Sequence, residues 1–143
     1  MSKIALASNA SGTGTLTIAA PNTNSDRTLN LPDNNGTIGF AGVPQSGATK
    51  TGSYTLAVSD VGQLIEVGSG GSITIPDATF ATGDIVSIFN NTSGSITITC
   101  DITTAYISGI DADDASVSLL TRGLCSVLFI SSTVCVITGS VTT

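Results

Sequence analysis

The sequence contains no histidine and no tryptophan, and few of its 143 residues are charged. Without histidine, the chain cannot form a Ser-His-Asp or Cys-His nucleophile arrangement or a histidine-based metal site. Lys and Arg number 4 against 10 Asp and Glu, which gives a net charge of −6. Because an acidic chain is repelled by the phosphate backbone, we expect no nucleic-acid partner. These absences exclude most hydrolase chemistry.

Cysteines and long apolar runs are also scarce. Cys100, Cys125 and Cys135 are odd in number and have no CxxC spacing, so they predict neither a disulfide framework nor a zinc site. We expect all three to be small apolar core residues. No apolar run approaches the roughly 18 residues that would span a bilayer, and the polar start MSKIALASNAS does not predict a secretion signal. We therefore expect no membrane partner and no export.

The residues that are abundant favour strands. Ser and Thr total 41, and Ile plus Val (25) outnumber Leu (10). Side chains that branch at Cβ fit a pleated sheet and lose rotamer freedom in a helix. The predicted class is all-β.

A short phrase of polar and apolar residues closed by Pro-Asx occurs three times. It stands at 17–22 (TIAAPN), 28–33 (TLNLPD) and 72–77 (SITIPD). Proline has no N–H to give to a strand ladder, so each phrase predicts a short strand followed by its stop signal. The spacing of such units is typical of all-β folds.

Residues 1–40 are predicted to form an extended β arm. Its large apolar residues arrive in pairs two positions apart, which is strand periodicity. Burying so few apolar side chains does not offset the entropy lost when about forty residues become ordered, so the arm needs a partner to cover it. We predict that the arm attaches the chain to a particle, and that the docking residues are Leu16, Ile18, Leu29, Leu31, Ile38 and Phe40.

The rest of the chain is predicted to form a linker and a head. Residues 41–53 are rich in Gly, Ser, Thr and Ala and predict a linker. Residues 54–143 predict a compact antiparallel β-sandwich, jelly-roll-like in arrangement. Its strands are expected at about 54–58, 63–67, 72–75, 84–90, 95–100, 103–108, 115–120, 124–130 and 133–138.

The strand predicted at 124–130 is apolar on both faces. One face holds Leu124, Leu128 and Ile130, with Ser126 as its polar member. In a small antiparallel sandwich one face normally meets water, so a two-sided strand indicates either a central position in the sheet or a subunit interface.

No cofactor, metal or catalytic residue is predicted. Asp111, Asp113 and Asp114 form the main acid cluster, and such a cluster could contribute to a calcium site, but the glycine and distal Glu of an EF-hand are missing. We interpret the cluster as a solvated turn. The glycine-rich stretches SGTGTL and GSGGS lack the GK[ST] of a phosphate-binding loop and are interpreted as turns.

Two stretches resemble known families. Residues 10–38, ASGTGTLTIAAPNTNSDRTLNLPDNNGTI, resemble a segment that recurs in bacteriophage tail-fibre and other virion fibre proteins. Residues 122–141, RGLCSVLFISSTVCVITGSV, are similar to the closing hairpin of small phage fibre and head-decoration domains, which often carry a tryptophan where Cys135 stands.

The resemblance implies a non-enzymatic virion component, commonly a homotrimer, on the capsid or tail surface. Its expected partners are itself and the major capsid or tail proteins, and the virion would be assembled in the host cytoplasm. The short chain favours a capsid decoration (cement) protein or short fibre. The alternatives are a tail-fibre receptor-binding component that contacts a host-surface glycan, a carbohydrate-binding module using Tyr54 and Tyr106, and a glycosidase or lyase using paired Asp carboxylates.

Overall fold

The computed structural model describes residues 42–143, together with Ser11 and Thr13. The predicted arm-docking residues Leu16, Ile18, Leu29, Leu31, Ile38 and Phe40 lie outside the described residues. Ten strands and one turn of 3-10 helix occur in the described part: β1 (Ser53–Thr55), η1 (Val58–Asp60), β2 (Leu64–Val67), β3 (Ser72–Pro76), β4 (Ile85–Asn90), β5 (Ile96–Asp101), β6 (Thr104–Ile107), β7 (Ser116–Leu119), β8 (Leu124–Ser131), β9 (Val134–Gly139) and β10 (Val141–Thr142).

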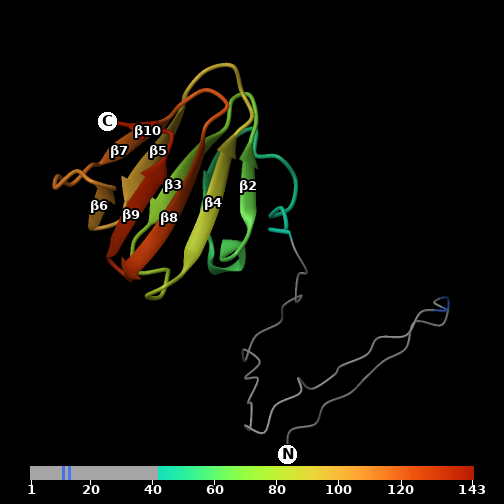
Figure 1. Ribbon diagram of the computed structural model, residues 1–143, viewed down its shortest axis with the longest axis horizontal. Coiled ribbons are helices and arrows are strands. Elements are labelled where there is room, and N and C mark those ends of the chain that lie inside the picture. Colours follow the sequence, from blue (N-terminus) through green and yellow to red (C-terminus); the bar gives the residue numbers. More distant parts are fainter. Residues whose placement is uncertain (1–10, 12, 14–41) are drawn as a thin grey trace, which may run out of the picture. The chain divides into compact units, whose positions relative to one another are not determined.

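These strands form two five-stranded sheets packed as two layers (Figure 1). Sheet A has the order β2-β4-β8-β9-β6, and sheet B has the order β1-β3-β5-β7-β10. The prediction of an all-β sandwich is confirmed. Nine of the strands fall close to their predicted positions, whereas the two-residue β10 was not predicted.

The sheets are mixed, which differs from the predicted antiparallel, jelly-roll-like arrangement. Four strand pairs are parallel, namely β1-β3, β3-β5, β2-β4 and β6-β9. Parallel pairs are possible because the chain changes sheet after almost every strand, so two neighbouring strands of one sheet are usually connected through a strand of the other sheet rather than by a tight hairpin. Within the described residues, only β8 and β9 are consecutive in sequence and neighbours in one sheet.

The core lies between the two sheets and is built from alternate residues of each strand. Along β8, for example, Cys125, Val127 and Phe129 are buried and their neighbours are not. The ring of Phe129 stacks on that of Phe80, with centroids 3.9 Å apart. The side chains buried at 0% exposure include Ile65, Ile73, Ile75, Ile88, Ile98, Leu119 and Ile137.

Residues 44–50, which the sequence predicts to be part of a linker, lie along the edge of β2. We call this segment the strap. Its residues Gln45 and Lys50 pair in parallel with β2. Backbone hydrogen bonds run from Leu64 N–H to the Pro44 carbonyl and from Lys50 N–H to the Glu66 carbonyl, both at 2.8 Å. The strap therefore belongs to the head, as a continuation of sheet A.

A buried carboxylate holds the strap in place. Asp60 is fully buried. Its oxygens accept hydrogen bonds from Ser46 Oγ at 2.5 Å, from Tyr54 Oη at 3.1 Å and from Ala57 N–H at 2.8 Å. Lys50 closes the cluster: Nζ donates to the Ser46 carbonyl at 2.9 Å and lies 4.2 Å from the centroid of the Tyr54 ring. Because a buried charge is costly without such partners, this cluster ties the strap to β1 and η1.

Limited trypsin digestion tests this attachment. Trypsin should cleave slowly after Lys50 in the native chain, because the strap must first leave β2. Asp60→Ala removes the acceptor shared by Ser46 and Tyr54 and should destabilise the head by about 1–3 kcal/mol, with cleavage after Lys50 accelerated at least tenfold by mass spectrometry. Asp84→Ala, which removes an exposed carboxylate bonded to Ala81 N–H, is the control and should change cleavage little. Rapid cleavage after Lys50 in the unsubstituted chain would contradict the attachment.

Candidate functional site

The three residues predicted to form a subunit interface lie on the outer side of β8. Leu124 and Ile130 are 52% and 47% exposed, and Leu128 between them is partly buried. The opposite side of β8 faces the core. β8 is also the middle strand of sheet A, so the two-sided pattern is explained in part by a central position. The apolar outer side has no cover in the described part of the chain.

Neighbouring strands extend this side into a row of apolar residues. Ile85 on β4 lies opposite Leu128 on β8, Leu128 lies opposite Val136 on β9, and Val136 lies opposite Tyr106 on β6. Four strands thus contribute one continuous apolar row. We call the outer side of sheet A the apolar face. Its apolar members are Leu64, Ile85, Phe89, Tyr106, Leu124, Leu128, Ile130, Val134 and Val136, and its polar members include Glu66, Ser87, Thr104, Ser126 and Thr138.

The outer side of sheet B has the opposite character. There Thr55 lies opposite Thr74, Thr74 opposite Thr99, and Thr99 opposite Ser116, again across four strands. We call this side the hydroxyl face. Apart from Pro76 and Asp101, its outward residues are all Ser or Thr: Ser53, Thr55, Ser72, Thr74, Thr97, Thr99, Ser116, Ser118 and Thr142.

One charged residue occurs on the strands of sheet A. It is Glu66, on β2 at the side of the sheet. Glu66 accepts hydrogen bonds from Asn91 Nδ2 at 2.6 Å and from Gln45 Nε2 at 3.1 Å. The hydrogen bond from Asn91 is the main cause of a lowered pKa of the Glu66 carboxyl. The charge is therefore held beside the strap, away from the centre of the apolar face.

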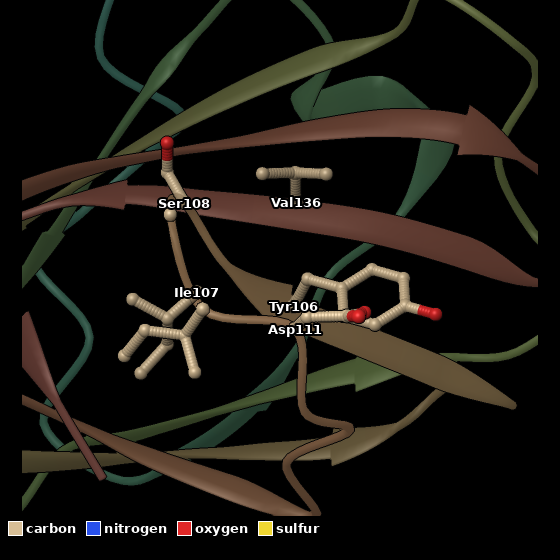
Figure 2. Close-up of a pocket in the computed structure, with 7 residues that line it drawn as sticks. Tyr106, Ile107, Ser108, Asp111 and Val136 are labelled. Carbon is tan, nitrogen blue, oxygen red and sulfur yellow. The ribbon is translucent and has the colours of Figure 1, made fainter.

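A hollow opens beside the Tyr106 end of the apolar row. It has a volume of about 350 Å³ and is lined by Tyr106, Val136 and the turn at residues 107–111. Figure 2 shows the Tyr106 ring together with the side chains of Val136 and Asp111. The lining combines apolar side chains, such as Ile107 and Val136, with the hydroxyl of Tyr106 and the carboxylate of Asp111.

The acid cluster at 111–114 has a structural role. Asp113 Oδ1 accepts a hydrogen bond from Ala105 N–H at 2.8 Å, and Asp114 N–H donates to the Ala105 carbonyl at 2.9 Å. These bonds hold the turn against β6. Asp114 Oδ2 is buried without a hydrogen-bond partner. Among the described residues, no group of three or more His, Cys, Asp or Glu side chains is placed to hold a metal ion.

The three cysteines are buried in the core as free thiols, as predicted. Burial raises the pKa of Cys125 to about 12. Burial is also the main cause for the other two, raising the pKa of Cys100 to about 11 and that of Cys135 to about 12, with nearby acidic groups adding to the effect.

Sequence reasoning identified Leu124, Leu128 and Ile130 but missed Ile85 and Val136. The alternation in IVSIFN and VCVITG would have marked both as members of one strand face. It could not have shown that these faces adjoin Leu128, because that depends on strand order. Tyr106 was singled out as a possible sugar platform, and it ends the apolar row. Tyr54, the other candidate, points instead to Asp60.

Comparisons with protein-family models, with curated protein sequences and with solved structures found nothing that matches this chain. Within residues 42–143, no helix is long and apolar enough to cross a membrane.

The thiols should be unreactive in the folded chain. At pH 8 an aromatic disulfide reagent should modify none of Cys100, Cys125 and Cys135 within an hour, and all three after unfolding in guanidinium. Each thiol has a pKa of about 11–12 in the folded chain and an ordinary pKa of 9.0 when unfolded. The contribution of the neutral thiols to folding stability is therefore complete below pH 9.0 and is lost as the pH rises through about 11–12. The thermal midpoint should therefore fall steeply above pH 9. Modification within minutes at pH 8 would show that the core opens readily.

Proposed function

We propose that the chain is a non-enzymatic structural protein of a bacteriophage particle, either a capsid decoration protein or a short fibre. In this proposal the N-terminal arm attaches it to the capsid or tail, the head stands outward, and the chain self-associates as a homotrimer. The resemblance of residues 10–38 and 122–141 to virion fibre and head-decoration proteins motivates the proposal.

The observation that carries the proposal is the conformation of the third copy of the repeated phrase. Residues 72–77 form β3 and the turn that follows it. Ile73 and Ile75 are fully buried against the facing sheet, and Pro76 is the last residue of the strand. Asp77 then accepts hydrogen bonds from the backbone N–H and the hydroxyl of Thr103, at 3.2 and 3.1 Å. In the described part of the chain, the repeated phrase therefore forms a strand whose apolar side chains must be covered by another sheet.

The same phrase at 17–22 and 28–33 supports strand-forming units in the arm. By analogy with Ile73 and Ile75, the pair Leu29 and Leu31 requires a facing layer, and a capsid or tail protein can supply one by strand addition. The apolar face of the head supports self-association, because exposed apolar surface of this extent commonly marks a contact with another protein.

Glycan binding by the head is a second candidate, since a tail-fibre component would contact the host surface. The hollow beside Tyr106 favours it, because a tyrosine ring next to the Asp111 carboxylate offers a stacking surface and a hydrogen-bond acceptor to a sugar. A glycan-array screen that detects binding lost in Tyr106→Ala would support this candidate.

Deletion of residues 1–40 tests attachment by the arm. The truncated head should remain folded, with β-type circular dichroism, because the core described above comes from residues 54–141. It should no longer decorate particles, as judged by occupancy in electron micrographs. Retention of normal occupancy by the truncated head would contradict attachment by the arm.

A matched pair of substitutions separates attachment from folding. Leu29→Ser with Leu31→Ser should lower particle occupancy at least tenfold and leave the melting temperature of the head unchanged. Ile73→Ser with Ile75→Ser, at the equivalent positions of the third copy, should unfold the head, because each removes a fully buried side chain. Equal effects of the two pairs on the melting temperature would contradict a separate role for the arm.

A further inference from the structure

We infer that the apolar face of sheet A is covered by the apolar face of another copy of this chain. The inference extends the self-association in the proposed function by naming the surface that carries it, and its members include Ile85, Tyr106 and Val136, which lie outside the 124–130 strand.

The outer faces of the two sheets differ in the chemistry of their side chains. Both sheets belong to one sandwich and come from one Ser- and Thr-rich chain. Sheet B presents hydroxyls to solvent at nearly every outward position, as expected for a face that stays in water. Sheet A instead places Ile85, Leu128, Val136 and Tyr106 side by side. The row of Thr and Ser side chains makes the outer face of sheet B suited to water. The corresponding row of apolar side chains makes the outer face of sheet A suited to burial.

The distribution of charge favours a second copy as the occupant. The chain has a net charge of −6, so copies repel one another over most of their surface. β4, β6, β8 and β9, which make up most of the apolar face, carry no charged residue. The central strands of two such faces can meet without bringing carboxylates together, since Glu66 and Asp111 lie at the β2 and β6 sides of the sheet. The apolar face also offers no acidic or basic pattern to attract a charged partner.

The flat area of the face is somewhat smaller than one side of a standard interface. Five strands at about 4.8 Å spacing and about six residues at 3.4 Å per residue give a flat area of roughly 500 Å². Protruding side chains make the accessible surface larger than this flat area. A standard protein–protein interface buries about 800 Å² on each partner, so the face approaches that size.

The ends of the apolar row complement one another. Ile85, which is 46% exposed, ends the row on β4, and the hollow of about 350 Å³ lies beside Tyr106 at the other end (Figure 2). When two copies turn their apolar faces to a common axis, the β4 side of one face meets the β6 side of the next. An exposed apolar side chain from the β4 side would then lie against the hollow of its neighbour.

The decisive experiment compares two pairs of cross-strand neighbours. Leu128→Glu with Val136→Glu charges the apolar row, and Thr74→Glu with Thr99→Glu charges the equivalent row of the hydroxyl face. Sedimentation of the full chain at about 50 μM should give two or more times 14.2 kDa for the unsubstituted chain and for the Thr pair. The Leu128/Val136 variant should sediment as a 14.2 kDa monomer with unchanged circular dichroism, which corresponds to association weakened at least a hundredfold.

Cysteine cross-linking provides a second measurement that does not depend on charging the sheet. Leu128→Cys should form disulfide-linked pairs of chains under mild oxidation, whereas Thr74→Cys should not. The native thiols do not interfere, because all three are buried.

Three results would overturn the inference. They are a monomeric unsubstituted chain, a folded Leu128/Val136 variant that keeps its oligomeric mass, and an unsubstituted monomer that associates only after residues 1–40 are deleted. The last result would mean that the chain's own arm covers the face. A chain that decorates particles as a monomer would contradict this inference and the self-association in the proposed function, and it would leave attachment by the arm standing.

Discussion

The head depends on one constraint: each strand must bury one side against the opposite sheet, and the chain changes sheet after almost every strand. A strand such as β3 therefore has its hydrogen-bonding neighbours and its packing partners in distant parts of the sequence. Parallel pairs occur where two successive visits to one sheet run in the same direction, as in β1-β3, β3-β5 and β2-β4, whereas β5 and β7 pair antiparallel. The hairpin of β8 and β9 is the exception in the described residues, and it places Phe129 in the centre of the core. Loss of an inward side chain thus disturbs both sheets.

Since the inner sides are committed to the core, the outer sides are available for contacts with other molecules. They differ in chemistry even though both are built by the same alternation. Every side chain in the row from Thr55 to Ser116 can hydrogen-bond to water, whereas in the row from Ile85 to Tyr106 only the Tyr106 hydroxyl can. This asymmetry gives the sandwich two different outer sides, one with an apolar row suited to contact and the other suited to solvent.

The junction between arm and head has its own reinforcement. The strap continues sheet A, and the buried carboxylate of Asp60 joins it to Tyr54 and η1. A pull on the arm would therefore act on a segment paired along β2 rather than on a free linker.

Local pattern in the sequence determined much of this protein. The period of two in stretches such as 124–130 placed nine strands and separated their inward residues from their outward ones, and the β-branched composition identified the all-β class. Strand order could not be obtained in this way. An alternation with a period of two shows which residues of a strand share one side, but it does not show which other strands lie next to that strand. Only the tertiary structure decided that residues 44–50 join β2, that half of the strand pairs are parallel, and that Ile85, Leu128, Val136 and Tyr106 form one row. The physical reason is that pairing between distant strands is set by how the two inner faces fit together, and no short stretch of sequence contains that information.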